Sequence, residues 1–263
     1  MEGDILLRED AGAVATLTLK NPGKLNALSN GMLDALQAQL DALAGDRSIR
    51  VVVIRGEGRA FCAGHDLREM TAAREADDGG QAEFEALFDK CSKMMMSIVN
   101  LPQPVIAQVH GIAAAAGCQL VATCDLAVAA SDARFGVNGV NIGLFCSTPM
   151  VALTRNIGRK KAFELLTTGD FLTAEQAENV GLINHAAPPE KLKNTTRDLA
   201  EKIAGKLGPA VRIGKRAFYE QAEMTMAEAY AHTGKVIAAN MMRPDTAKGI
   251  EAFLDKRTPE WDQ

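Results

Sequence analysis

Two short loops contain residues that could bind and polarise a carbonyl group. The first, residues 56–67 (GEGRAFCAGHDL), follows the apolar run Val51–Ile54, and the second, residues 110–120 (HGIAAAAGCQL), follows Val105–Val109. Glycine permits tight turns with exposed backbone N–H groups, which suit an oxyanion. A Gly-rich turn also occurs without any ligand, and an Ala-rich stretch also suits close helix packing. For either loop alone, both explanations stay open.

The two loops hold equivalent places in the chain, which strengthens the ligand explanation. Each follows a continuous apolar run that is too short for a helix and is typical of a strand covered on both faces. The small residues of the second loop lead into a helix, whose N-terminus would add N–H groups and the positive end of its dipole. Because loops after neighbouring parallel strands meet at one sheet edge, the pair predicts a ligand site there.

The elements that position these loops alternate between strand and helix, which predicts an α/β fold. Ser29 is placed to cap a helix that runs to about Leu43. A hairpin is expected at the start of the chain, formed by Ile5–Arg8 and Val14–Leu19. A helix is expected at Phe84–Val99 and a further strand at Leu126–Ala129.

Beyond residue 147 the strand signal largely disappears. Thr148–Pro149 predicts a capped helix start, and Thr173 with Gln176 forms a capping-box pattern. The segment from about 190 to 254 is helical in pattern, with breaks at Gly208–Pro209 and Arg243–Pro244. An oligomerisation or ligand-covering element and a packed C-terminal subdomain explain this tail equally well.

Composition excludes several classes of function. A net charge of −4, without a long Lys/Arg run, gives no basic surface for nucleic acid or for an anionic membrane. The five cysteines lack zinc-ligand spacing, so we expect reduced thiols and no metal site. No secretory segment and no apolar run near 18 residues is evident, and a cytoplasmic location is expected by default.

Several motifs together resemble the crotonase, or enoyl-CoA hydratase/isomerase, superfamily. They are segments 60–67 (AFCAGHDL), Gly111 to Gln119, 24–28 (KLNAL) and 253–257 (FLDKR), in the family's order. The resemblance implies a spiral of ββα units with a helical C-terminal region, divided at 1–190 (acyl-CoA-binding core) and 191–263 (oligomerisation region). It also implies a coenzyme A (CoA) thioester as substrate, no further cofactor, and a homotrimer or dimer of trimers.

The same resemblance assigns roles to individual residues. The backbone N–H groups of His65 and Ala116 would form the oxyanion hole. The CoA adenine and pantetheine would be bordered by Lys24, Ala27, Ala63, Asp66 and Leu67. Phe253 and Lys256 would reach the CoA of their own or a neighbouring subunit. Asp66 is also explained as a turn residue.

Two positions depart from the family pattern. Hydration of an enoyl thioester needs an acid and a base, which typical hydratases supply with two glutamates. Here the first falls at Gln119 and the second at Gly139, or at Asn138 if the match shifts by one residue. None of these side chains transfers a proton. Each lost group removes roughly 10²–10⁴-fold in rate, so two-glutamate hydration is not expected.

Three functions remain open. The chain could be an enzyme of the hydratase/isomerase group that stabilises a thioester enolate, or a catalytically silent acyl-CoA-binding subunit. The third is a decarboxylase or thioesterase in which the His65 side chain acts, although a loop-stabilising histidine is the alternative. Cys146, beside Ser147, has no sequence-adjacent activating base and is expected to be buried and inert.

Overall fold

The first two strands form the predicted hairpin. In the structure, a computed structural model that describes residues 5–261, β1 (Leu6–Ala11) pairs antiparallel with β2 (Val14–Leu19). Residues 15, 17 and 19 of β2 are buried, because alternate side chains of a strand face the same way. The hairpin begins a larger sheet through β2.

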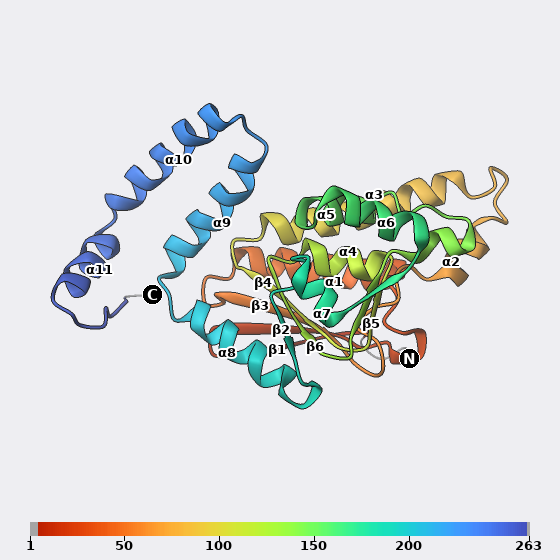
Figure 1. Cartoon of the computed structure of the whole chain (residues 1–263), viewed down its shortest axis with the longest axis horizontal. Helices are drawn as coiled ribbons and strands as arrows, with labels where there is room; N and C mark the ends of the chain where they lie inside the picture. Colours follow the sequence, from red (N-terminus) through yellow and green to blue (C-terminus); the bar gives the residue numbers. More distant parts are fainter. Residues whose placement is uncertain (1–4, 262–263) are drawn as a thin grey trace.

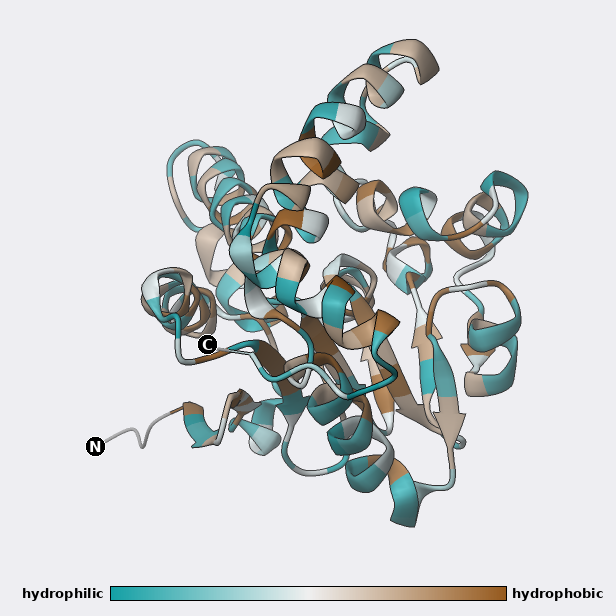
Figure 2. Cartoon of the chain, turned by 90° about the vertical axis from the view of Figure 1, so that its left-hand side faces the viewer, coloured by the Kyte–Doolittle hydropathy of each residue, from teal (hydrophilic) through white to brown (hydrophobic). Residues whose placement is uncertain are grey.

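Four parallel strands extend this sheet in the order β1-β2-β3-β4-β6-β9. Their bounds are β3 (Val51–Gly56), β4 (Val105–Val109), β6 (Leu126–Ala130) and β9 (His185–Ala187). The apolar runs predicted as strands are confirmed, and they are buried since helices cover the sheet. Figure 2 shows hydrophobic residues concentrated on the strands inside the body.

A second, three-stranded sheet has the order β5-β7-β8, with β5 (Ile112–Ala114), β7 (Arg134–Gly136) and β8 (Phe171–Thr173). Sequence analysis missed these three strands and β9, because three residues are too few to show an alternating pattern. The repeated order of two strands and a helix, such as β4-β5-α4, gives the predicted ββα units.

Helices surround the sheets and form the C-terminal third of the chain (Figure 1). Those of the body are α1 (Asn30–Gly45), α2 (Leu67–Ala73), α3 (Gln81–Asn100), α4 (Ala116–Thr123), α5 (Pro149–Asn156), α6 (Arg159–Thr168), α7 (Ala174–Asn179) and α8 (Leu192–Ala204). The others are α9 (Gly208–Ala222), α10 (Met226–Met241) and α11 (Pro244–Leu254). None of the described helices is both long and apolar enough to cross a membrane.

Two of the three predicted caps are confirmed. The Ser29 hydroxyl accepts a hydrogen bond from the Met32 N–H at 3.2 Å, and Thr173 with Gln176 forms the expected capping box. The expected Thr148 cap is wrong, because its own backbone is already helical (φ −74°, ψ −42°) and its side chain makes no capping bond. Pro149 does begin α5.

The last three helices form an arm that projects from the body (Figure 1), and we call α9 to α11 the C-terminal arm. By contrast, α8 packs on β2, β3, β4 and β6. The predicted boundary at 190/191 therefore lies just before a helix that covers the sheet, and the division into domains stays a prediction. The arm exposes large apolar side chains, including Phe218, Met226, Tyr230, Ile237, Met242 and Phe253.

A buried ion pair joins α9 to the body. The Lys215 Nζ lies 2.7 Å from the Asp125 Oδ2 and donates to the carbonyl oxygens of Ile98 and Gln103 at 2.9 and 3.0 Å. The Tyr219 hydroxyl donates to the other Asp125 oxygen at 2.8 Å. Burial lowers the pKa of Lys215 and, together with the negative charge of Asp125, raises that of Tyr219. The start of the arm is thus fixed to the core.

Candidate functional site

The two predicted loops lie in direct backbone contact. The Phe61 N–H donates to the His110 carbonyl at 3.1 Å, and the Cys62 N–H donates to the Ile112 carbonyl at 3.1 Å. In return, the Ala114 N–H donates to the Cys62 carbonyl at 2.9 Å. The loops that follow β3 and β4 therefore run side by side, as expected for neighbouring parallel strands.

Small residues are needed where these loops meet. A Cβ atom on Gly117 would lie 2.1 Å from the Cys62 carbonyl oxygen, and one on Gly111 would lie 2.1 Å from the Arg59 carbonyl oxygen. Gly111 also has φ +59°, a conformation that favours glycine. Close packing and ligand binding were alternative explanations for these residues. Close packing accounts for these two glycines and brings the two loops together, and ligand binding by the loops stays a prediction.

The N–H groups of His65 and Ala116 lie near this junction. Ala116 is the first residue of α4, and Ala115 before it has φ 48° and ψ −117° and donates its own N–H to the Gly136 carbonyl at 2.8 Å. A Cβ atom on Gly64 would lie 3.5 Å from the Ala116 nitrogen. Within residues 5–261, neither the His65 nor the Ala116 N–H donates a hydrogen bond. Two unused donors are therefore held on adjoining loops.

The His65 side chain is buried and has one unused nitrogen. Its Nδ1 lies 3.1 Å from the Leu28 carbonyl oxygen, which can only accept, so we assign the proton to Nδ1. Its Nε2 is buried without a partner among the described residues, and the ring meets Phe88 edge-on at 5.6 Å. Burial lowers the pKa of His65. The ring is thus neutral near pH 7 and presents an acceptor at Nε2.

This depressed pKa predicts a loss of stability in acid. Because the unfolded chain takes up the His65 proton before the folded chain does, the stabilisation is complete above the unfolded pKa of about 6.5 and is lost as pH falls through the folded pKa. We expect the free energy of unfolding, measured with urea, to fall more steeply below about pH 6.5 in the wild type than in His65→Gln. Equal slopes would contradict this assignment.

The two positions that the resemblance assigns to the family glutamates differ in their surroundings. Gln119 is 5% exposed on α4, and its Oε1 has no partner among the described residues. Gly139 is buried in the short 3₁₀ helix Asn138–Ile142. A Cβ atom there would lie 2.3 Å from the Leu144 carbonyl oxygen and 2.8 Å from the Cys146 Sγ. A glutamate side chain at residue 139 therefore has no room beside the Leu144 carbonyl oxygen and the Cys146 sulfur.

Cys146 is buried, as the sequence predicted. Burial raises the pKa of its thiol, and it raises the pKa of the Cys118 thiol, on α4 beside Gln119, to about 12. A thiol is nucleophilic only as the thiolate, so neither group is activated. No group of three or more His, Cys, Asp or Glu side chains among the described residues is arranged to hold a metal ion.

Four of the five body residues assigned to CoA adjoin one another. The segment before α1 pairs with the first loop, because the Leu28 N–H donates to the Gly64 carbonyl at 2.7 Å and the Ala63 N–H donates to the Leu25 carbonyl at 3.1 Å. This contact places Ala27 and Ala63 on paired segments. The Lys24 Nζ lies 2.9 Å from the Asp66 Oδ2.

Asp66 is also the N-cap residue of α2, so its position is compatible with both predicted roles, a CoA contact and a turn residue. Its side chain accepts a hydrogen bond from the Arg68 N–H at 2.9 Å. Burial alone would raise the pKa of Asp66, but the Lys24 ammonium and the Arg68 N–H hold it below its usual range. Leu67, the fifth residue, follows it and is 53% exposed. The carboxylate is ionised and paired at neutral pH.

The structure of one chain does not bring Phe253 and Lys256 to these residues. Phe253 lies in the last turn of α11 and Lys256 follows that helix, and Figure 1 shows α11 and α2 at opposite ends of the molecule. Phe253 is 80% exposed. Their contact with the CoA of a neighbouring subunit stays a prediction.

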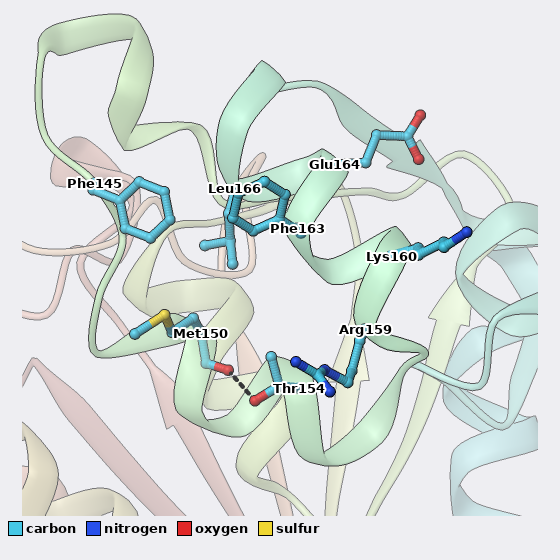
Figure 3. Close-up of a pocket in the computed structure, with 8 residues that line it drawn as sticks. All are labelled: Phe145, Met150, Thr154, Arg159, Lys160, Phe163, Glu164 and Leu166. Atoms are coloured by element: carbon cyan, nitrogen blue, oxygen red, sulfur yellow. Dashed lines mark hydrogen bonds between the residues drawn. The ribbon is translucent and has the colours of Figure 1, made fainter.

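No sequence motif predicted the hollow of about 960 Å³ that lies beside α5 and α6 (Figure 3). Its lining residues are Phe145, Met150, Thr154, Arg159, Lys160, Phe163, Glu164 and Leu166. Figure 3 shows Phe145, Met150 and Leu166 around one space, whereas Lys160 and Glu164 point away from it. None of the predicted site residues lines this hollow, although α5 packs on α4 and α6 packs on the 3₁₀ helix that contains Gly139.

Known proteins match nearly the whole chain. A family model described as Enoyl-CoA hydratase/isomerase matches residues 9–263. The human enoyl-CoA hydratase domain-containing protein 3, mitochondrial, is 44% identical over 94% of this chain and 80% of its own length. The 2,3-dehydroadipyl-CoA hydratase of Escherichia coli is 33% identical over 94% of both chains. A crystal structure of enoyl-CoA hydratase from Mycobacterium smegmatis superposes with a TM-score of 0.95 at 51% identity, covering 98% of this chain and 99% of that one. These matches confirm the predicted fold.

The expected cytoplasmic location is contradicted. Relatives from human, Xenopus laevis and rat, at 41–44% identity, are all named as mitochondrial proteins. The expectation depended only on seeing no targeting segment. Such segments are removed from mature proteins and take no part in the fold, so a folded core does not identify its compartment.

Proposed function

The chain belongs to the enoyl-CoA hydratase/isomerase family, and we propose that it binds an acyl-CoA and polarises the thioester carbonyl with the N–H groups of His65 and Ala116. One observation carries this proposal: these two donors lie on adjoining loops and have no partner among the described residues. A thioester oxygen that becomes an enolate oxygen gains negative charge. Donors that are already fixed in place stabilise that charge without reorganisation.

Helix α4 adds to this stabilisation. Ala116 is its first residue, so the N–H groups of its first turn and the positive end of its dipole lie on the same side as the proposed oxygen. The strained backbone of Ala115, together with its bond to Gly136, fixes the direction of the following N–H. The polarising part of the site therefore depends on backbone geometry and not on the side chains that differ from typical hydratases.

Binding of two matched ligands tests the proposal. Calorimetry would compare butyryl-CoA with S-butyl-CoA, a thioether that has the same chain length and no carbonyl. We expect butyryl-CoA to bind about tenfold more tightly or better, since each hydrogen bond to a developing charge contributes measurably. Equal affinities would remove the oxyanion hole from the proposal, and no binding of either ligand would remove CoA binding as well.

A second candidate is an acyl-CoA-binding protein without turnover. The Gln119 amide cannot act as a general acid or base, and the closed space around Gly139 leaves no room for a carboxylate. Incubation with a panel of acyl-CoA thioesters, followed by mass spectrometry, separates the two functions. Turnover that His65→Gln abolishes would favour an enzyme that uses the free Nε2, and binding without any turnover would favour the silent protein.

A further inference from the structure

Four arginines that lie far apart in the sequence gather where the C-terminal arm leaves the body. Arg47 and Arg50 belong to the segment between α1 and β3, Arg212 lies in the first turns of α9, and Arg243 precedes α11. We call these four residues the arginine cluster. They take no part in the candidate acyl-CoA site, whose loops follow the carboxyl ends of β3 and β4.

Contacts with the segment between α8 and α9 place two members of the cluster. The Arg50 Nη1 donates to the Ala204 carbonyl at 2.7 Å. Four residues further on, a Cβ atom on Gly208 would lie 3.6 Å from the Arg212 Nη1. Both guanidinium groups therefore lie against the same short connection. Arg47 is three residues before Arg50 in the exposed approach to β3.

The packing of α10 against α9 brings in the fourth member. A hollow of about 470 Å³ between these helices is lined by Ala210 and Ile213 near the start of α9 and by Asn240 near the end of α10. Arg243 follows Asn240 by three residues, and its charge acts on Arg212 in the first turns of α9. Its Nε is buried and has no hydrogen-bond partner among the described residues.

The cluster has an excess of positive charge. Burial and the charges of Arg47, Arg243 and Arg50 lower the pKa of Arg212. Within the described part of the chain, neither Arg47 nor Arg212 forms an ion pair or a side-chain hydrogen bond to a carboxylate.

The nearby carboxylates do not neutralise this charge. Asp46 is held by Arg8 at 3.0 Å, and Asp245 lies 3.7 Å from the Arg243 Nη2. Like charges in a partly buried place repel one another unless an anion lies among them.

We propose that the arginine cluster is a binding site for the phosphate or pyrophosphate group of a small ligand. Guanidinium groups match phosphate oxygens with paired N–H donors, and several around one anion give both affinity and orientation. The start of α9, a helix of 15 residues, adds unsatisfied N–H groups at the same place. The site lies at the amino end of β3, opposite the loops that hold the candidate oxyanion hole.

Anion titrations of full-length variants test this site. Thermal unfolding would be followed with sodium pyrophosphate, with ADP and with sodium chloride at matched ionic strength. We expect pyrophosphate to raise the melting temperature of the wild type more than chloride does. In Arg212→Gln and in the exposed Arg47→Gln, the calorimetric affinity should be about tenfold weaker or worse.

Arg134→Gln is the matched control, because Arg134 is exposed on β7 of the small sheet and lies outside the arginine cluster. It should respond to anions as the wild type does. Tighter binding of ADP than of pyrophosphate, if lost in Arg212→Gln, would support a nucleotide as the source of the phosphate. Equal responses of all proteins to pyrophosphate and chloride would overturn the proposal. A change of native mass in Arg47→Gln and Arg212→Gln, without any response to anions, would also overturn it. That result would show that a second chain's carboxylates neutralise the cluster.

Discussion

Replacing Lys215 with methionine should lower the free energy of unfolding by about 3–5 kcal/mol, because it removes one partner of a buried ion pair. The Lys215 and Asp125 side chains are only 6% and 15% exposed. Methionine fills similar space but leaves the Asp125 carboxylate without its counter-charge. It also leaves the Ile98 and Gln103 carbonyls without their shared donor. Urea or guanidinium unfolding measures the change.

Two further variants make this prediction specific. Lys160→Met removes an exposed lysine and should change stability by no more than about 0.5 kcal/mol. Adding Asp125→Asn to Lys215→Met removes the unpaired charge, so the double variant should lose less than the sum of the two single changes. A Lys215→Met protein as stable as Lys160→Met would mean that the ion pair does not hold the arm to the body.

Replacing Ala116 with proline should remove one oxyanion donor and slow any reaction through a thioester enolate by roughly 10²–10³-fold. Proline is tolerated at the first position of a helix, where its missing N–H breaks no internal bond. Ala115, at φ 48° and ψ −117°, is neither helical nor in the extended conformation that a following proline prefers, so the folding of this variant is measured separately. The change therefore deletes an N–H from the backbone with little other alteration of α4.

An infrared measurement checks this even without turnover. The carbonyl stretch of a ¹³C-labelled acyl-CoA moves to lower frequency when hydrogen bonds polarise the bond. The shift should be present in the wild type and in Ala116→Gly, which keeps the N–H, and should shrink in Ala116→Pro. Circular dichroism would confirm that all three proteins are folded. An undiminished shift in Ala116→Pro would show that the carbonyl lies elsewhere.

Local patterns predicted the elements that obey local rules. Ser29 accepts a hydrogen bond from an otherwise unpaired N–H at a helix N-terminus, and Val51–Ile54 fills a covered sheet, so both could be found from a few neighbouring residues. The strands Phe171–Thr173 and His185–Ala187 exist because β7 and β6, which lie far away in the chain, offer them partners. No pattern within three residues indicates such pairing, which is why they were missed.

The candidate site shows the same division. The resemblance located His65 and Ala116, and the structure places their loops in contact, but the free His65 Nε2 depends on Leu28, far away in the chain. The arginine cluster could not have been predicted, since Arg47 and Arg243 are brought together only by the packing of the arm. Charge counts over the whole chain conceal such local excess.

The crowded backbone at Gly139 also bears on how the chain could change during evolution. Restoring glutamate there meets the Leu144 carbonyl at 2.3 Å and the Cys146 sulfur at 2.8 Å, so the first substitution disturbs the 144–146 loop before it supplies a proton. A smaller residue at 146 and a rearranged loop must accompany it, and Gln119 must change as well. With the family glutamates assigned to Gln119 and Gly139, we expect the substitution at residue 139 alone to be destabilising, so that the changes at 119, 139 and 146 are needed together.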